Sequence, residues 1–390
     1  MNYNLQTYIP RQLEQPLREH QQIFPVVALL GPRQCGKSTL ALHTISGAED
    51  FVYLDLERPA DLRKLEDPEL FFRANVAKRF CLDEIQQRPD LFPVLRGLVD
   101  QDRQPGKWLL LGSASRDLIQ QSSETLAGRI GYLELTPFIQ AELPPDREIE
   151  LHDHWLRGGF PLSLFQENDR FSYLWRENFI RTFIERDLPQ LGAQISAKLI
   201  RRFLSMLAHN QGQLLNNSHL GSALGISHNT VRNYIDILEQ AFILRSLPPF
   251  LPNLKKRLIK SPKVYLRDSG LLHSLLEIDT FNRLLGHPVF GSSWEGFVIE
   301  NLLAALPGWQ ASFYRTSSGN EIDLILQRQD RTVAVEIKAS TAPKLSKGFF
   351  LALNDLGITE AWVVCPAHEP YALREQVRVG GIGDVVAALR

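Results

Sequence analysis

The chain has 390 residues, 44% of them hydrophobic and 22% charged, with a formal net charge of −1. This length leaves room for two or three domains, each with its own core, and the composition is that of an ordinary soluble globular protein. The three cysteines lie far apart, which excludes the paired spacing of a zinc site or a disulfide framework and favours a reducing compartment.

Neither the N-terminus nor any apolar run indicates a membrane role. Residues 1–6 have no basic start and no apolar core, so no signal peptide is expected. No apolar run reaches the length that spans a bilayer. We therefore expect a cytoplasmic protein without a membrane partner.

Charge is distributed unevenly along the chain. Residues 1–150 carry 17 Lys and Arg against 22 Asp and Glu, a net −5, whereas residues 194–267 carry 11 against 2, a net +9. The overall charge near zero therefore hides a basic segment, which indicates contact with nucleic acid.

Residues Gly31 to Ser38 fit the phosphate-loop pattern G-x-x-x-x-G-K-[ST]. The apolar run 24–30 predicts a buried strand before the loop, and Thr39 to His43 predicts a helix after it. This arrangement aims backbone N–H groups and the helix dipole at an anion. We expect ATP here, with Lys37 at the β- and γ-phosphates and the Ser38 hydroxyl on Mg²⁺. The expected nucleotide-binding residues are Gly31, Pro32, Arg33, Gln34, Cys35, Gly36, Lys37, Ser38 and Thr39.

Polar residues end two further apolar runs. Asp83 and Glu84 follow one of them, where Asp83 is expected to hold Mg²⁺ through water and Glu84 to polarise the attacking water. Ser113 ends the run 107–112, and its hydroxyl can sense the γ-phosphate or act only as a cap. Arg129 precedes the predicted strand 131–136 and either faces out of its own subunit or is a solvated surface arginine.

The order of these parts resembles the AAA+ ATPases. It looks most like the prokaryotic branch whose loop reads Gly-Pro-Arg-Gln-x-Gly-Lys and whose second motif reads Leu-Asp-Glu-Ile-Gln, as residues 31–37 and 82–86 do. The resemblance implies that Ser113 is the first sensor and that Arg129 is a finger completing a neighbour's site. Such a finger implies a homo-oligomer, and we expect a hexamer. Arg157 is our candidate for the second sensor.

The basic segment predicts a helix-turn-helix. Helical patterns at 199–208, 218–224 and 227–240 flank a turn at Gly225, and Ser227 is expected to cap the third helix. The exposed residues at the start of that helix are of types that reach DNA bases or phosphates. These residues are His228, Asn229, Arg232 and Asn233.

A β-ribbon with a basic wing is expected to follow, between Phe242 and Tyr265. The wing cations are Lys255, Lys256, Arg257 and Lys260. Winged helices also bind proteins, and a run of charge is often only solvated. The net +9 in a motif of groove-binding geometry favours DNA.

Acidic residues lie within two strand-like runs near the C-terminus. Asp323, Glu336 and Lys338 form the pattern D-x(12)-E-x-K, and an acid and a lysine two apart on a strand share a face. Such carboxylates can hold Mg²⁺ against a scissile phosphate, and the alternative is a hairpin with cross-strand ion pairs. A preceding helix, 294–303, offers Glu300 or Glu295 as another acid.

This stretch resembles the restriction-endonuclease-like fold, and the tail of the ATPase family named above has that fold. We therefore expect an α/β protein with three parts. They are a AAA+ P-loop module (1–150), a helical connector plus winged helix (151–275) and a restriction-endonuclease-like α/β domain (285–390). The resemblance implies the fold, but cutting does not follow from it, because such domains sometimes only bind.

Three functional hypotheses remain. The leading one is an oligomeric ATPase that binds and remodels DNA, with branched DNA such as a Holliday junction as the expected target. The second is a Mg²⁺-dependent DNA nuclease regulated by its ATPase. The third is a signalling or defence ATPase whose winged helix contacts protein.

Overall fold

The computed structural model describes residues 8–47, 49–113, 122, 124–144, 149–191, 196–252, 258–366 and 369–390. The chain divides into two compact units. The first runs to Phe138 and includes 240–242, and the second comprises 139–239 and 243–390. In the described part of the chain, no helix is both long and apolar enough to cross a membrane.

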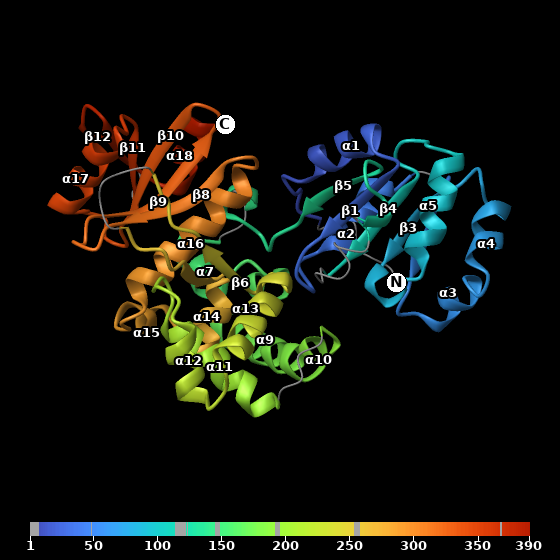
Figure 1. The fold of residues 1–390 in the computed structure, drawn as a ribbon, viewed down its shortest axis with the longest axis horizontal. Coiled ribbons are helices and arrows are strands. Elements are labelled where there is room, and N and C mark those ends of the chain that lie inside the picture. Colours follow the sequence, from blue (N-terminus) through green and yellow to red (C-terminus); the bar gives the residue numbers. More distant parts are fainter. Residues whose placement is uncertain are drawn as a thin grey trace. The chain divides into compact units, whose positions relative to one another are not determined.

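The first unit is built on a parallel sheet in the order β2-β3-β4-β1-β5 (Figure 1). Its strands are β1 (Val26–Leu30), β2 (Phe51–Asp55), β3 (Arg79–Asp83), β4 (Trp108–Gly112) and β5 (Ile130–Glu134). Because the strands are parallel, their carboxyl ends meet at one edge, where ligands of such sheets bind. β4 lies between β1 and β3, so the residues that follow these three strands are neighbours.

Strand β1 is buried on both faces, as a near-continuous apolar run predicts. Val26, Ala28 and Leu30 belong to a core that includes side chains of two helices, α4 and α5. Helix α1 packs against β1 and α2. The helices of this unit are α1 (Glu14–Ile23), α2 (Lys37–Ile45), α3 (Pro59–Lys64), α4 (Pro68–Ala74) and α5 (Leu91–Gln101), with a short 3₁₀ helix at Ile85–Gln87.

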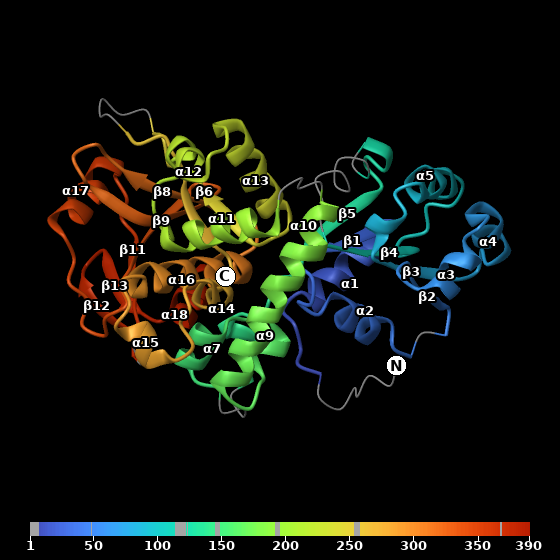
Figure 2. The ribbon, with the colours of Figure 1, turned by 90° about the horizontal axis from the view of Figure 1, so that it is seen from below.

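The second unit opens with helices. They are a 3₁₀ turn (Gln140–Glu142), α7 (Leu151–Arg157), α8 (Pro161–Leu164), α9 (Asp169–Thr182), a π-helical segment (Phe183–Asp187), α10 (Leu188–Gln190), α11 (Ala197–His209), α12 (Asn217–Leu224) and α13 (His228–Gln240). Figure 2 shows α11, α12 and α13 gathered beside strand β6 (Leu244–Leu247). β6 pairs antiparallel with β7 (Lys263–Leu266). The predicted three helices and two-stranded ribbon are therefore present.

Local chemistry explains where α12 ends and α13 begins. Gly225 ends α12 in the left-handed conformation, with φ at 69°. The Ser227 hydroxyl accepts a hydrogen bond from the Thr230 N–H at 3.0 Å, which is the cap that the sequence predicts for α13. The side chains of α13 that recur at helical spacing on one side of the helix are buried. They are Val231, Tyr234, Ile235 and Leu238.

A mixed sheet in the order β12-β13-β11-β10-β9-β8 forms the C-terminal part of this unit. Its strands are β8 (Gln310–Arg315), β9 (Glu321–Arg328), β10 (Arg331–Ile337), β11 (Ala361–Val364), β12 (Tyr371–Arg374) and β13 (Val377–Gly380). The helices are α14 (Ser269–Leu275), α15 (Phe281–Leu285), α16 (Phe290–Ala305), α17 (Lys347–Leu356) and α18 (Ile382–Leu389). α17 packs against β9, α16 against β10 and α18 against β11 and β13. The α/β class predicted from the sequence, with a parallel P-loop core and a separate mixed sheet, is confirmed.

The segment that joins β6 to β7 runs beside the edge strand β8. The Phe250 N–H donates to the Phe313 carbonyl at 2.6 Å, and the Ile259 N–H donates to the Arg315 carbonyl at 3.1 Å. The ribbon is thus hydrogen-bonded to the C-terminal sheet through its own backbone. Lys260 lies in this segment and is exposed, whereas the expected wing residues Lys255, Lys256 and Arg257 lie outside the described residues.

Candidate functional site

The phosphate loop joins β1 to α2 at the carboxyl edge of the parallel sheet. Two of its positions require glycine. A Cβ on Gly31 would lie 2.2 Å from the Leu135 carbonyl oxygen, and Gly36 has φ at 103°. Because the backbone can adopt this path, the loop curls around the Lys37 ammonium, which donates to the carbonyls of Gly31 at 3.0 Å and Pro32 at 2.8 Å. A buried positive charge therefore lies inside the loop, as phosphate binding requires.

The predicted Mg²⁺ residues are in contact. The Ser38 hydroxyl donates to the Asp83 carboxylate at 2.6 Å, and Tyr53 from β2 donates to the same oxygen. A hydroxyl and a carboxylate are the hard oxygen ligands that Mg²⁺ prefers, with phosphate oxygens completing its shell. The donor set therefore fits. Tyr53 was not predicted, because nothing in its strand pattern marks it.

Glu84 lies directly after β3 in a left-handed conformation, with φ at 57°. Its backbone N–H donates to Asp83 Oδ1 at 2.9 Å. Burial raises the pKa of the Glu84 carboxyl, while the charges of Lys37 and Arg33 act to lower it. A carboxylate with a raised pKa beside the phosphate loop suits a group that orients water.

Gln86 connects Glu84 to the predicted sensor. The Gln86 side-chain amide donates to Glu84 Oε2 and to the Ser113 hydroxyl, the latter at 3.0 Å. Ser113 follows β4, between the strands that carry the loop and the acids. In the sequence, Gln86 stands out only as the last residue of the Leu-Asp-Glu-Ile-Gln motif. Its position two residues after an acid was the available signal.

Other residues of the loop have distinct surroundings. Arg33 pairs with Glu57 at 3.0 Å and lies 3.9 Å from Glu84. The buried Cys35 thiol donates to the Leu135 carbonyl at 3.4 Å. Gln34 and Thr39 are exposed.

Arg11, for which the sequence predicts no role, supports the loop from the N-terminal side. Its guanidinium donates to the Cys35 carbonyl at 3.1 Å and to the Thr136 carbonyl at 2.6 Å. It also lies 4.2 Å from the centre of the Phe138 ring. Arg11 therefore ties the loop to the segment after β5.

Arg129 lies at the amino ends of the parallel strands, whereas the loop lies at their carboxyl ends. Ile130 pairs with Val26 at the start of β1, whereas the loop follows Leu30 at its end. Five strand residues at about 3.3 Å each separate the two edges, farther than an arginine side chain extends. Arg129 instead pairs with Asp100 of α5, with Nη2 2.6 Å from Oδ1, and this hydrogen bond lowers the pKa of Asp100. The arginine therefore cannot act on its own phosphate loop.

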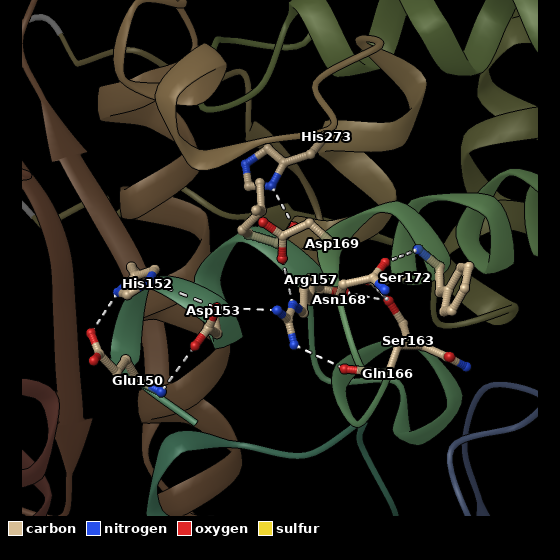
Figure 3. Close-up of polar contacts among 12 residues, drawn as sticks. Glu150, His152, Asp153, Arg157, Ser163, Gln166, Asn168, Asp169, Ser172 and His273 are labelled. Carbon is tan, nitrogen blue, oxygen red and sulfur yellow. Dashed lines mark hydrogen bonds and ion pairs between the residues drawn. The ribbon is translucent and has the colours of Figure 1, made fainter. Parts of the chain in front are cut away.

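Arg157, our candidate second sensor, is held inside the second unit (Figure 3). Its Nε donates to Asp169 at 2.7 Å, and Nη2 lies 3.4 Å from Asp153. Its Nη1 donates to the Gln166 carbonyl at 3.2 Å. With two carboxylates around it and 14% of its side chain exposed, Arg157 has a structural role at the end of α7.

The predicted DNA-contacting residues of α13 are exposed. His228, Asn229, Arg232 and Asn233 all lie in its first two turns. They share the side of the helix that does not pack on α11 or on the core. Because they are exposed, these polar groups are available to a ligand, whereas the side chains on the buried side of α13 are not.

The C-terminal motif brings acids and lysines together. The Lys338 ammonium lies 2.6 Å from Glu336 and 4.0 Å from Asp323. Lys263 of β7, which was not predicted, lies 2.7 Å from Glu321, 3.0 Å from Glu295 and 3.9 Å from Asp323. Lys338 itself lies one residue beyond the end of β10.

Of the two glutamates offered as the helical acid, Glu300 lies away from the cluster, paired with two arginines. Burial acts to raise the pKa of Glu300, but its ion pairs with Arg245 and Arg267 lower that pKa to about 2. Glu295, five residues earlier on the same helix, is the acid that joins the cluster through Lys263. The two glutamates are five residues apart, so they leave α16 in different directions.

The Mg²⁺ expected at this cluster does not fit the residues around it. The Lys263 ammonium already lies among three carboxylates. Burial and the nearby charge of Asp323 raise the pKa of the Glu336 carboxyl, against the opposing effect of Lys338, and a raised pKa weakens a carboxylate as a metal ligand. Among the residues that the structure describes, no three His, Cys, Asp or Glu side chains are grouped to hold a metal ion.

Three family models match successive parts of the chain. Residues 24–143 match an AAA domain, residues 148–282 a domain of unknown function (DUF8612) and residues 290–384 another domain of unknown function (DUF4143). Two mycobacterial proteins, Rv2008c of Mycobacterium tuberculosis and Mb2031c of Mycobacterium bovis, are each 41% identical over 375 residues. The matches cover 94% of this chain and 84% of each relative. This chain belongs to the Rv2008c family.

The Rv2008c family member described here is a P-loop ATPase of the AAA+ type, because the matched AAA domain contains the loop and both acids. Similar solved structures include the Walker-type ATPase PABY2304 of Pyrococcus abyssi, at 16% identity, with 70% of this chain and 97% of that chain covered and a TM-score of 0.48. The Thermotoga maritima RuvB Holliday junction branch migration motor matches at 19% identity, with 63% and 92% covered and a TM-score of 0.31. These two likenesses are too distant to indicate what this chain acts on.

Proposed function

We propose that this AAA+ ATPase is an oligomer that binds DNA through its helix-turn-helix and remodels it at the expense of ATP. The observation that carries the proposal is the exposed start of α13, with His228, Asn229, Arg232 and Asn233. A helix held by its apolar side, with its first turns free, can enter the major groove of a duplex.

Exposed cations support the same interface. Lys198, Arg201 and Arg202 are exposed on α11, and Arg232 and Lys260 are exposed elsewhere in the basic segment. Such cations supply the part of DNA affinity that does not depend on sequence. Not all of the net +9 is available, because Arg245, Lys263 and Arg267 pair with acids of α16 and β9.

The ATP chemistry is assigned to residues of the sheet edge. Lys37 binds the β- and γ-phosphates, and Ser38 and Asp83 hold Mg²⁺, which neutralises phosphate charge when bound. Glu84 polarises the attacking water, and Ser113 senses the γ-phosphate. The contacts among Ser38 and Asp83, and among Glu84, Gln86 and Ser113, support these roles.

Arg129 is proposed to act on a neighbouring copy of the chain. Its distance from its own loop, across the length of β5, supports action in trans. A finger supplied in trans requires an oligomer, and a closed ring satisfies every site. We propose a hexamer, with duplex arms of branched DNA, such as a Holliday junction, as the substrate class.

The decisive measurement is ATP turnover with single-stranded, duplex and four-way junction DNA side by side. We expect the junction to stimulate turnover most, and the double variant Asn229→Ala with Arg232→Ala to lose most of this stimulation while keeping its basal rate. Arg96→Ala removes an exposed charge from α5 and should behave as the native protein. Equal turnover with and without every DNA would exclude DNA as the effector and favour the signalling or defence alternative.

The wing is tested by binding rather than by turnover. Replacing Lys255, Lys256, Arg257 and Lys260 should weaken binding to all DNA sequences alike. The slope of log affinity against log salt should fall by about 0.9 for each phosphate that the wing no longer neutralises. Unchanged affinity and slope would mean that the wing faces protein or solvent.

The nuclease alternative is favoured by one observation, the meeting of Asp323, Glu336 and Lys338. It predicts Mg²⁺-dependent cleavage that is lost in Lys338→Ala. Cleavage at this cluster would also require Lys263 to leave the acids that it now neutralises.

A further inference from the structure

Lys263 is one of the most enclosed lysines of the second unit. Its residue is 3% exposed, and its ammonium lies against Glu321 and Glu295, with Asp323 at 3.9 Å. These acids come from β9 and α16, far apart in the sequence. A single ammonium therefore joins three carboxylates that would otherwise repel one another.

The backbone holds Lys263 in this place. Lys263 is the first residue of β7, where it pairs with Leu247 of β6 and forms a bridge with Leu214. Its side chain also lies 5.5 Å from the centre of the Phe313 ring on β8. Withdrawing the ammonium would expose carboxylates already deprived of water, so the occupied arrangement is the stable one.

The remaining members complete a network without an ion. Lys338 neutralises Glu336 at 2.6 Å, and the Tyr265 hydroxyl donates to Glu295 at 2.5 Å. The second oxygen of Glu336 is buried and has no hydrogen-bond partner in the described part of the chain.

We propose that Lys263 is the resident cation of this cluster: its ammonium takes the position of a divalent ion among Glu295, Glu321 and Asp323. The native cluster then binds no divalent cation of its own and fastens the β6–β7 ribbon to the C-terminal sheet. Among the described residues these carboxylates are not grouped to hold a metal ion in the native arrangement, so a divalent-cation site forms only when they close together after the ammonium is removed. This inference does not depend on the proposed DNA function, and it opposes the nuclease alternative.

The test counts Mn²⁺ bound to the full chain without nucleotide, by electron paramagnetic resonance. All variants carry Asp83→Asn, which removes the carboxylate of the phosphate-loop site. We expect no saturable Mn²⁺ binding with Lys263 present. Lys263→Gln should gain one Mn²⁺ site, with a Mn²⁺ affinity at least tenfold higher than that of the chain with Lys263 present. Adding Asp323→Asn should remove that site. Lys260→Gln, an equal charge change three residues away, should gain nothing.

If Lys263→Gln does not fold, Mn²⁺ binding to the protein with Lys263 in place still tests the proposal. Mn²⁺ bound with Lys263 in place and lost on Asp323→Asn would overturn the proposal, as would a folded Lys263→Gln that gains no site. Lys263→Arg keeps the charge and should bind no Mn²⁺. Mg²⁺ should raise the melting temperature of a folded Lys263→Gln variant but not that of the Lys263→Arg variant.

Discussion

Glu84 is held from two sides by side chains of the motifs around it. Gln86 donates to its carboxylate, and Arg33 of the phosphate loop lies 3.9 Å away. Gln86 also donates to Ser113, while its own side-chain oxygen is buried and has no hydrogen-bond partner among the residues that the structure describes. Gln86 therefore links the predicted sensor to the acid through two hydrogen bonds of one side-chain amide.

The role of Glu84 is tested by an isosteric change. Glu84→Gln keeps the shape and removes the group that polarises water, so turnover should fall by roughly 10²–10⁴-fold with nucleotide affinity preserved. Lys37→Ala, in contrast, should weaken the binding of a fluorescent nucleotide. Phosphate release and nucleotide titration measure the two effects, and unchanged turnover in Glu84→Gln would contradict the assignment.

Gln86 is expected to position Glu84 and to set its protonation. Its hydrogen bond to the carboxylate lowers the pKa of Glu84, against the larger effect of burial. Gln86→Ala should raise that pKa, so activity should be lost at a higher pH on the acid side of the kcat profile, with KM nearly unchanged. Gln87→Ala changes the exposed neighbour and should leave the profile in place. An identical profile in Gln86→Ala would show that the contact is incidental.

Helix α16 fastens the ribbon with two acids on different sides. Glu295 contacts Lys263 of β7, while Glu300 contacts Arg245 of β6 and Arg267 just after β7. The cations of this basic segment therefore serve partly inside the molecule. The net charge counted along a segment therefore overstates the charge on its surface wherever its cations pair with acids from another segment.

The Glu300 pairs are expected to matter for stability. The pKa of Glu300 falls from its ordinary 4.5 to about 2, which corresponds to about 3 kcal/mol of stability at neutral pH. Because the folded pKa is depressed, this stability is present above pH 4.5 and is lost as the pH falls towards 2. Glu300→Gln should lower the unfolding free energy at pH 7 and flatten its acid dependence.

Glu375→Gln is the matched control, since Glu375 is exposed and should change the denaturation curve by less than about 0.5 kcal/mol. A Glu300→Gln curve that overlays the native one at pH 7 would mean that the two arginines find other partners.

For the whole molecule, the question is whether one copy can complete an ATP site. Arg129 lies at the edge of the sheet away from its own loop and pairs with Asp100. A finger role therefore needs a second copy, and the Asp100 pair would have to be exchanged for phosphate contacts. This is a property of the assembly and not of the isolated chain.

Mixing two inactive variants tests the assembly. Arg129→Ala should keep nucleotide binding and slow hydrolysis by roughly 10³–10⁵-fold. Combined with Glu84→Gln subunits, it should regain part of the activity, because an interface can then form with both Glu84 and Arg129 intact. The reverse interface lacks both groups, so recovery is partial. If hydrolysis does not recover at any mixing ratio, with mixed oligomers verified by pull-down, the assignment of Arg129 as a finger acting in trans is wrong.

The sequence alone determined the phosphate loop, the acids after the third strand of the sheet and the elements that carry them. The loop at Gly31 to Ser38 and the acids Asp83 and Glu84 are recognisable because nucleotide chemistry needs residues at short, fixed spacings. The core side of α13 and its cap at Ser227 follow from helical periodicity and local hydrogen bonding, which a single segment contains.

Only the tertiary structure decided which distant charges meet. Lys263 lies on a different strand from the acids that it neutralises, and its spacing from Glu295, Glu321 and Asp323 carries no pattern. The same holds for Glu300 with Arg245 and Arg267, and for Tyr53 with Asp83. Ion pairs and hydrogen bonds depend on distances of a few ångströms in space, and those distances are set by how strands and helices pack.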